Sequence, residues 1–305
     1  MNRALLSGLL LGAAVGAGAV AFWPRAPEPV AVETAFVPPL AKDAPVGPWG
    51  DAVRLGERLL TETAATAPQH VGNGLACANC HLDAGRKAGA APLWAAFVNF
   101  PAYRAKNGEI NSFQKRAQDC FLYSMNGVPP ALGSRELLAI ESYAAFMAKG
   151  LPSGESPPGR GYPKLAKPAL AGDAGRGALV YGEHCVACHG DRGQGGFAIN
   201  RKVPPLWGAQ SYNWGAGMAT IDKAAAFIHA NMPLGTERSL SVQQAWDVAT
   251  FIDGQVRPQD PRYAGSPQAT RAKHHDSPYS LYGTVVAGRL LGDPATTPAA
   301  GQQTG

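Results

Sequence analysis

The five-residue string Cys-x-x-Cys-His occurs twice in this 305-residue chain, and it limits the possible folds more than any other feature. The copies are Cys77-Ala78-Asn79-Cys80-His81 and Cys185-Val186-Ala187-Cys188-His189. Two cysteines at this spacing attach covalently to one haem, and the adjacent histidine faces its iron. A zinc site needs further paired ligands, and a thiol redox pair needs no adjacent histidine. The strings therefore predict two covalently bound haem c groups, with His81 and His189 as proximal iron ligands.

A second repeated string indicates two copies of one domain. Pro92-Leu93-Trp94 recurs as Pro205-Leu206-Trp207 after the second haem string. A carbonyl of each segment is expected to accept the other ring N–H of the proximal histidine, and each tryptophan is expected to pack against haem. Apolar spacing predicts helices over residues 51–65, 134–149, 172–184, 219–231 and 241–253, with no convincing strand. The expected fold is all-α, with two tandem class I cytochrome c-like domains, each wrapped around one haem c.

The amino-acid composition of the remaining segments predicts where the domains begin and end. Residues 4–23 form an uncharged apolar run, which predicts a signal peptide or N-terminal membrane anchor over 1–23 and an exported, periplasmic protein. Prolines predict a tether over 24–48, and prolines with glycines predict a linker over 151–168. The predicted cytochrome domains span 49–150 and 169–258. A C-terminal extension follows over 259–305 and is expected to be disordered at its end.

Charge narrows the choice of partners. The formal net charge is +5, from 27 Lys and Arg against 22 Asp and Glu. This mild excess contains no Lys/Arg block, which argues against nucleic-acid binding. It fits an anionic small substrate or an acidic protein partner. Only one long uncharged run is present, so a polytopic membrane protein is excluded.

The second iron ligand is predicted to differ between the domains. In domain two the candidate is Met232, at the end of a helix and before a proline, with Met218 as the alternative. In domain one, counting from the repeated tryptophan aligns Cys120 with Met232, whereas counting back from the final helix aligns Met125. Cys120 is the one cysteine outside the two haem strings and has no partner after haem attachment, which favours a functional role. A buried, inert cysteine is the competing interpretation.

Taken together, these motifs resemble the dihaem thiosulfate dehydrogenases. The resemblance rests on the first haem string, Arg116 four residues before Cys120, Ser124-Met125-Asn126-Gly127, Pro204-Pro205-Leu206-Trp207-Gly208, Gly215-Ala216-Gly217-Met218 and Asn231-Met232-Pro233-Leu234-Gly235. It implies a His/Cys haem, through His81 and Cys120, at which two thiosulfates are joined into tetrathionate or the reverse reaction runs. It also implies a His/Met haem, through His189 and Met232, that passes electrons to an external acceptor such as a soluble cytochrome c.

The same resemblance implies the residues that act on substrate. Arg116 stands at a family position that holds the anion, and Arg104 matches a second such position, so the predicted catalytic residues are Cys120, Arg116 and Arg104. Thiosulfate is a dianion, and fixed guanidinium groups lower the cost of bringing two dianions together. Cys120 is expected to leave the iron and attack sulfur as a nucleophile. Tyr123 departs from the family, which often has arginine there.

Two other functions stay open on the sequence. A non-enzymatic dihaem electron carrier would use His/Met ligation in both domains, through Met125 and Met232. A cytochrome of a multi-protein sulfur-oxidation complex would also use a cysteine-ligated haem, but it would load thiosulfate onto a carrier protein.

Overall fold

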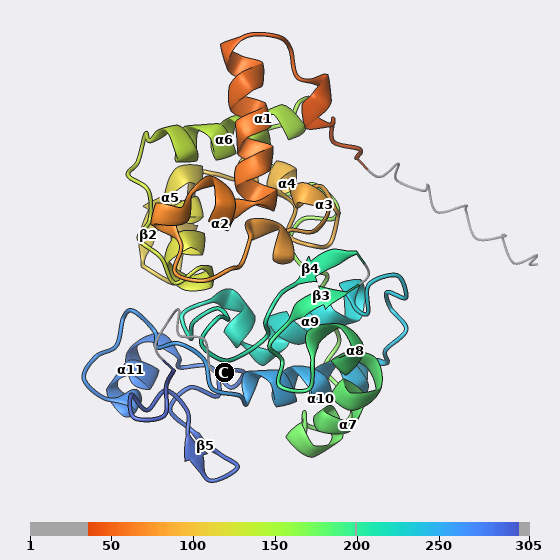
Figure 1. The fold of residues 1–305 in the computed structure, drawn as a ribbon, viewed down its shortest axis with the longest axis vertical. Helices are drawn as coiled ribbons and strands as arrows, with labels where there is room; N and C mark the ends of the chain where they lie inside the picture. Colours follow the sequence, from red (N-terminus) through yellow and green to blue (C-terminus); the bar gives the residue numbers. More distant parts are fainter. Residues whose placement is uncertain (1–35, 199, 299–305) are drawn as a thin grey trace, which may run out of the picture. The chain divides into compact units, whose positions relative to one another are not determined.

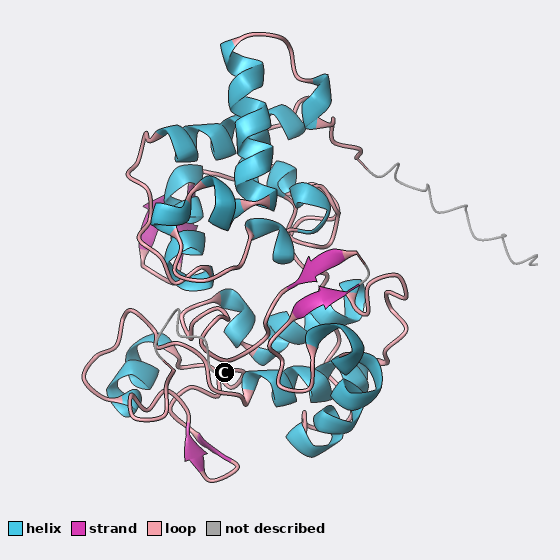
Figure 2. Cartoon of the chain, viewed as in Figure 1, coloured by secondary structure: helices cyan, strands magenta, loops and turns pink. Residues whose placement is uncertain are grey.

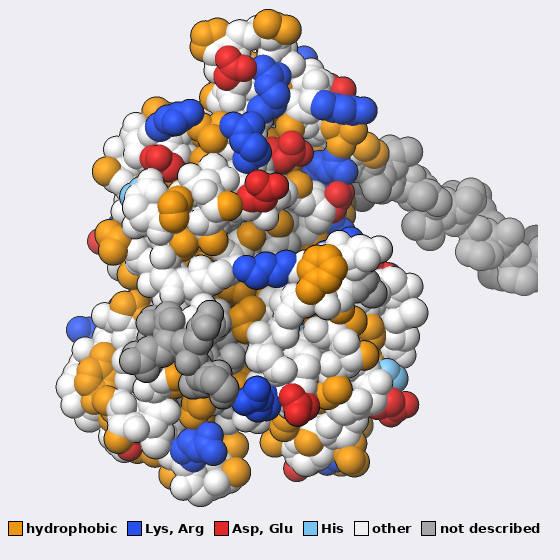
Figure 3. Space-filling model, in the orientation of Figure 1, with side chains coloured by type: hydrophobic (Ala, Val, Ile, Leu, Met, Phe, Trp, Pro, Cys, Tyr) orange, Lys and Arg blue, Asp and Glu red, His pale blue; other side chains and the backbone are white. Residues whose placement is uncertain are grey.

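The computed structural model describes residues 36–198 and 200–298, and within them helices predominate (Figure 2). The signal peptide or anchor predicted over 1–23 lies outside these residues. No helix in the described residues is long and apolar enough to cross a membrane. On the face in Figure 3, Lys and Arg side chains are interspersed with Asp and Glu.

The first helical group is built on α1 (Pro48–Thr61) and α6 (Arg135–Met147), which cross in close contact (Figure 1). Pro48 stands in the first turn of α1, where no backbone donor is lost. The Ser134 side chain begins α6 by accepting from the Leu137 backbone N–H. A Cβ added at Gly56 would lie 2.2 Å from the Ala139 carbonyl oxygen, so this crossing needs glycine.

The second group repeats this arrangement with α7 (Ala174–His184) and α10 (Val242–Asp253), and α9 (Ile221–Asn231) packs against α10. A Cβ added at Gly177 would lie 2.0 Å from the Asp247 carbonyl oxygen. Ser241 and Gln244 form a capping box at the start of α10. Both groups therefore place a glycine of their first long helix against their last one.

Short elements connect these helices. The remaining helices are α2 (Thr63–Thr66), α3 (Leu82–Gly85), α4 (Leu93–Phe97), α5 (Phe113–Asp119), α8 (Val186–His189) and α11 (Pro267–His274), with single turns η1 (Ala41–Asp43), η2 (Pro68–His70), η3 (Cys77–Asn79), η5 (Gly217–Ala219) and the π-helix η4 (Cys120–Ser124). The antiparallel hairpins are β1 (Ala102–Arg104) with β2 (Glu109–Asn111), β3 (Gly196–Ala198) with β4 (Arg201–Val203), and β5 (Val285–Val286) with β6 (Arg289–Leu290). The expectation of no strands was wrong, because strands of two or three residues are too short to show alternation.

The segments predicted to connect the domains pack against them. In the expected tether, Ala41 is fully buried and the Phe36 ring lies 4.9 Å from the Trp94 ring. In the expected linker, the Gly159 carbonyl accepts from Gly89 N at 2.7 Å and the Gly161 carbonyl accepts from Ala91 N at 2.8 Å. Proline and glycine rule out a long helix in such segments, but they leave the backbone free to pair with a neighbour.

Candidate active site and haem cradles

The first haem string is wound into a turn by its own neighbours. Thr63 Oγ1 accepts from Cys77 N at 3.1 Å and donates to the Leu59 carbonyl at 2.7 Å. The His81 N–H donates to the Cys77 carbonyl at 3.0 Å. The turn is thereby joined to the end of α1, and Cys77 and His81 line one cavity.

Each string's histidine has a carbonyl partner on Nδ1. His81 Nδ1 lies 2.6 Å from the Ala91 oxygen, and His189 Nδ1 lies 3.0 Å from the Pro204 oxygen. Both carbonyls belong to the residue just before the repeated Pro-Leu-Trp string, one position earlier than the segment named from the sequence. A donor role for Nδ1 leaves Nε2 of each ring free for a metal.

The cavity beside His81 has the composition that a haem c requires. Its volume is about 320 Å³. Its apolar wall comprises Leu60, Ala91, Pro92, Leu93, Ala96, Phe100, Phe113, Ala117, Phe121 and Ile140, and its polar lining comprises Cys77, His81, Cys120, Arg104, Arg116 and Arg160. A cysteine and the histidine of the first haem string therefore meet a third residue, Cys120, in an apolar cavity, and this set of sulfur and imidazole donors would fit a haem.

Cys120 is the residue around which the charged groups of this cavity are arranged. It lies where α5 passes into η4, and Arg116, one turn earlier, donates from Nη1 to Cys120 Sγ at 3.1 Å. Burial raises the pKa of this thiol, but the Arg116 guanidinium and the His81 ring outweigh burial and lower it to about 6. Burial, and then the Cys120 charge, raises the pKa of the Cys77 and Cys80 thiols to about 12. Among these three thiols, Cys120 is therefore the one whose pKa its surroundings lower.

Two further guanidinium groups line the same cavity. Arg104 comes from β1, and burial followed by the nearby Arg116 charge lowers its pKa. Arg160 comes from the segment predicted as a linker, and sequence reasoning missed it. The only feature of the sequence that could have indicated Arg160 is a single charged residue between Gly159 and Gly161 in a proline-rich stretch. Its place in the cavity wall follows from the backbone pairing of those glycines with residues 89–91.

The methionine proposed as an alternative to Cys120 has different surroundings. Met125 is 1% exposed and belongs to the buried core of the first helical group. Its backbone N–H donates to the Cys120 carbonyl at 3.1 Å, which closes the π-turn. The structure thus brings Cys120, rather than Met125, into the cavity that His81 lines.

The second cradle is assembled from α7, α9 and α10. Cys185, Trp207, Met218 and Met232 all pack against the apolar core of this group. Trp207 lies against Tyr181 and Phe251, with ring centroids 5.1 and 5.7 Å apart. Met232 directly follows α9, whereas Met218 lies in η5.

Comparisons with known proteins agree with this two-part arrangement. Residues 67–153 match the family described as "SoxA/TsdA, cytochrome c domain", and residues 172–252 match "Cytochrome C oxidase, cbb3-type, subunit III". A thiosulfate dehydrogenase of Thiomonas intermedia (strain K12) is 50% identical over 300 residues, covering 96% of both chains. This chain belongs to the thiosulfate dehydrogenase family. The family expected from the motifs is confirmed.

Other members of the thiosulfate dehydrogenase family extend the comparison. A thiosulfate dehydrogenase of Stutzerimonas stutzeri (strain A1501) is 47% identical over 85% of this chain and 86% of its own. The solved thiosulfate dehydrogenase TsdBA of Marichromatium purpuratum superimposes with a TM-score of 0.81 at 49% identity, over 87% of this chain and 59% of that chain. This chain thus spans about three-fifths of the solved one. The fold is confirmed as two tandem cytochrome c-like domains. The cofactors are haem c groups, and two haems fit the two domains.

Proposed function

We propose that this chain is an enzyme that oxidises two thiosulfates to tetrathionate and passes the two electrons to an external acceptor such as a soluble cytochrome c. The observation that carries the proposal is the Arg116–Cys120 contact of 3.1 Å in the cavity that His81 also lines. Family membership supports the substrate, since relatives at 50% and 47% identity are named thiosulfate dehydrogenases.

The proposed ligands follow from the two cradles. Cys77 and Cys80 would attach the first haem, and His81 and Cys120 would hold its iron. Cys185 and Cys188 would attach the second haem, and His189 and Met232 would hold its iron, with Met218 as the alternative to Met232. When bound, each haem accepts and releases one electron at a time, and thiolate ligation lowers a haem's potential relative to methionine.

The protein's own contribution at the first site is anion binding and an activated sulfur. Arg116, Arg104 and Arg160 line the cavity and can offset the charge of two thiosulfate dianions. Planar guanidinium groups suit this task because they donate two parallel hydrogen bonds to one oxyanion. Cys120 is the proposed covalent site: loss of two electrons to the external acceptor joins its sulfur to the first thiosulfate, and the second thiosulfate then attacks that sulfur–sulfur bond, forms tetrathionate and releases the Cys120 thiolate. In the net reaction two thiosulfates lose two electrons, and one sulfur–sulfur bond forms.

We also propose the domain boundaries and location that the sequence predicts. The cytochrome domains are placed at 49–150 and 169–258, with segments 24–48, 151–168 and 259–305 around them. Export to the periplasm, with residues 1–23 as signal peptide or anchor, accords with haem attachment through thioethers to both strings.

A direct assay tests the proposal. The purified dihaem chain is given thiosulfate and an artificial one-electron acceptor, and tetrathionate is measured. We expect one tetrathionate for every two electrons accepted. Failure to form tetrathionate without added proteins would favour a cytochrome of a multi-protein complex. A visible and near-infrared spectrum with no thiolate charge-transfer band would favour an electron carrier with Met125 as ligand.

A further inference from the structure

The last described part of the chain, residues 259–298, lies outside both matched cytochrome families, which end at residues 153 and 252. It contains α11 and the β5–β6 hairpin. Tyr282 and Leu291 within it are fully buried and belong to a core cluster that also contains Phe121, Tyr123 and Trp214. A segment added to two cytochrome domains therefore packs against the group that carries Cys120.

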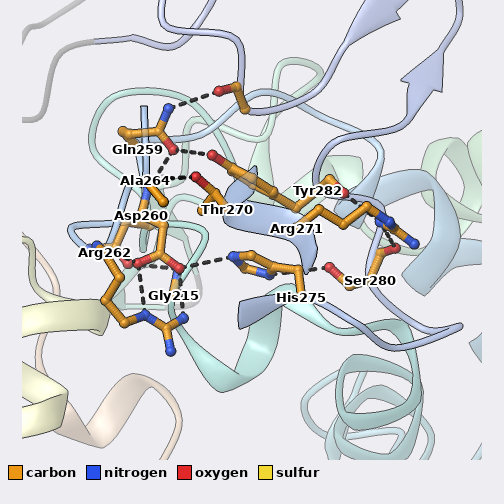
Figure 4. Close-up of polar contacts among 12 residues, drawn as sticks. Gly215, Gln259, Asp260, Arg262, Ala264, Thr270, Arg271, His275, Ser280 and Tyr282 are labelled. Carbon is orange, nitrogen blue, oxygen red and sulfur yellow. Dashed lines mark hydrogen bonds and ion pairs between the residues drawn. The ribbon is translucent and has the colours of Figure 1, made fainter. Parts of the chain in front are cut away.

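A buried network of ionic contacts connects residues of this segment to one another (Figure 4). Asp260 is fully buried, and its carboxylate accepts from Arg262 Nη2 at 2.6 Å and from Arg262 Nε at 3.0 Å. The same carboxylate lies 2.9 Å from His275 Nε2. The His275 ring stacks on Tyr282, with centroids 4.3 Å apart. A carboxylate buried in this way must keep its partners, so Arg262 is held in one orientation.

The network superficially resembles a Ser-His-Asp triad, because Ser280 Oγ lies 3.3 Å from His275 Nδ1. Ser280 is only 2% exposed, and its carbonyl accepts from Arg271 at 2.9 Å. A substrate has no approach to the Ser280 hydroxyl. The network is therefore better explained as a support that holds the Arg262 side chain in place than as a catalytic triad.

Arg262 connects this network to the π-helix η4. Its guanidinium carbon lies 5.1 Å from the centre of the Tyr123 ring, and Lys106 Nζ lies 3.5 Å from the same ring centre. Lys106 Nζ also donates a hydrogen bond to the Gly215 carbonyl. A Cβ added at Gly215 would lie 2.3 Å from the Tyr123 ring. The ring is thus confined by the Arg262 guanidinium, the Lys106 amino group and a backbone that approaches closely.

The π-turn that contains Tyr123 also depends on contacts from later in the chain. Asn213 donates from Nδ2 to the Leu122 carbonyl at 2.9 Å and from its backbone N–H to the Tyr123 carbonyl at 3.0 Å. Single π-turns are rare, and they persist where their surroundings determine them. Cys120 is the first residue of this turn, and Tyr123 is its fourth.

We propose that Arg262 is a positioning residue for Cys120. Anchored by Asp260 and His275, its guanidinium fixes the Tyr123 ring, and the fixed ring holds the π-turn in the geometry that points Cys120 Sγ into the cavity. The C-terminal extension then contributes to the active site by positioning Cys120. This inference rests on the proposed role of Cys120 as iron ligand and covalent site.

The test compares variants of the full dihaem protein. Tyr123→Leu and Arg262→Leu remove the ring and the cation, whereas Tyr123→Phe keeps the ring and Arg262→Lys keeps a cation. Arg271→Leu is the matched control, because it weakens the same extension through the Ser280 and Tyr282 carbonyls without facing Tyr123. The measurements are the thiolate charge-transfer band, kcat and KM separately, and deuterium exchange of the amides of residues 120–127.

Tyr123→Leu and Arg262→Leu should shift or weaken the thiolate band, speed amide exchange in η4 and lower kcat by roughly tenfold to a hundredfold, with KM changed less. Tyr123→Phe should match the parent protein, Arg262→Lys should recover most of the band, and Arg271→Leu should lower Tm without moving the band. An unchanged band and kcat in both leucine variants would overturn the inference. So would an equal shift in Arg271→Leu, since it would show a general effect of weakening the extension. Absence of the band in the parent protein would instead refute the proposed ligation.

Discussion

Arg116 Nη1 lies 3.1 Å from Cys120 Sγ, one helical turn away on the same face of the chain. This contact makes Cys120 the one thiol among three in the first cradle whose pKa falls rather than rises, because the Cys77 and Cys80 thiols have burial without an adjacent cation. The same guanidinium faces the cavity, where it can also meet an anion. One residue thus serves the sulfur and the substrate together.

Replacement of Cys120 separates the two ligation schemes. Cys120→Ala should keep both haems, lose the thiolate charge-transfer band and lose nearly all turnover, because it removes the proposed ligand and covalent site. Met125→Leu is the matched control. A volume-conserving exchange in the core should cost less than about 1.5 kcal/mol and leave the band in place. Spectra and turnover check both. Wild-type turnover in Cys120→Ala would favour the electron-carrier function.

Arg116→Ala should reduce kcat/KM about ten- to a hundredfold, mainly through KM. The reason is that one charge-assisted contact contributes about 1.5–3 kcal/mol. Arg116→Lys should recover only part, because an ammonium lacks the planar pair of donors. Steady-state kinetics with thiosulfate measure both. A KM equal to that of the parent protein in Arg116→Ala would remove Arg116 from the substrate site.

Arg160→Ala should raise KM by about two- to tenfold and reduce its dependence on ionic strength. Arg160 is exposed at the cavity, where its field is screened by salt. Lys164→Ala, four residues on and not among the residues lining that cavity, is the control and should change KM little. KM measured at low and high salt distinguishes them. Equal effects of the two changes would indicate general surface charge instead of a contact at the site.

Met232→Gly should abolish the methionine-to-iron band of the ferric protein and lower the potential of the second haem. Reduction of the first haem by thiosulfate should continue, while transfer to the acceptor slows. Redox titration and stopped-flow absorbance measure these two effects. If Met232→Gly leaves the band intact and Met218→Leu removes it, the ligand is Met218.

Two glycines of α7 should respond to alanine in opposite directions. A Cβ at Gly177 would meet the Asp247 carbonyl at 2.0 Å, so Gly177→Ala should destabilise the fold by about 1–3 kcal/mol through overpacking. A Cβ at Gly182 meets nothing within 4 Å, so Gly182→Ala should stabilise the helix by up to about 1 kcal/mol. Denaturant unfolding of the dihaem protein measures both. A destabilising Gly182→Ala would contradict the described packing.

The sequence was most informative where chemistry requires a fixed spacing. The two haem strings, the repeated Pro-Leu-Trp strings and the apolar periods together predicted two helical haem domains, because each depends on residues close together in the chain. The distal side of the first haem was harder: two counts disagreed between Cys120 and Met125. The π-turn at Cys120–Ser124 adds one residue to a helical turn, and no local sequence pattern predicts such a turn.

The features that could not be predicted depend on tertiary contacts rather than on local sequence patterns. Arg160 reaches the cavity because its neighbouring glycines pair with residues 89–91. Asp260, Arg262 and His275 form their network across a segment in which composition showed only polar residues and prolines. Neither arrangement leaves a period or a motif in the sequence, since neither the pairing of Gly159 and Gly161 with residues 89–91 nor the contact of Asp260 with His275 follows a helical or strand spacing.

The pairing of Gly161 with Ala91 has a practical consequence for protein engineering. Ala91 donates its N–H to Gly161 and offers its carbonyl to His81 Nδ1, so one residue joins the interdomain segment to the proximal histidine. A chimera that ends the first domain at residue 150 would discard Arg160 from the cavity wall and release the backbone segment 89–91 whose carbonyl contacts this imidazole. The portable unit of this catalytic half is therefore longer than the cytochrome domain itself, and a graft into another redox protein should extend at least through residue 161.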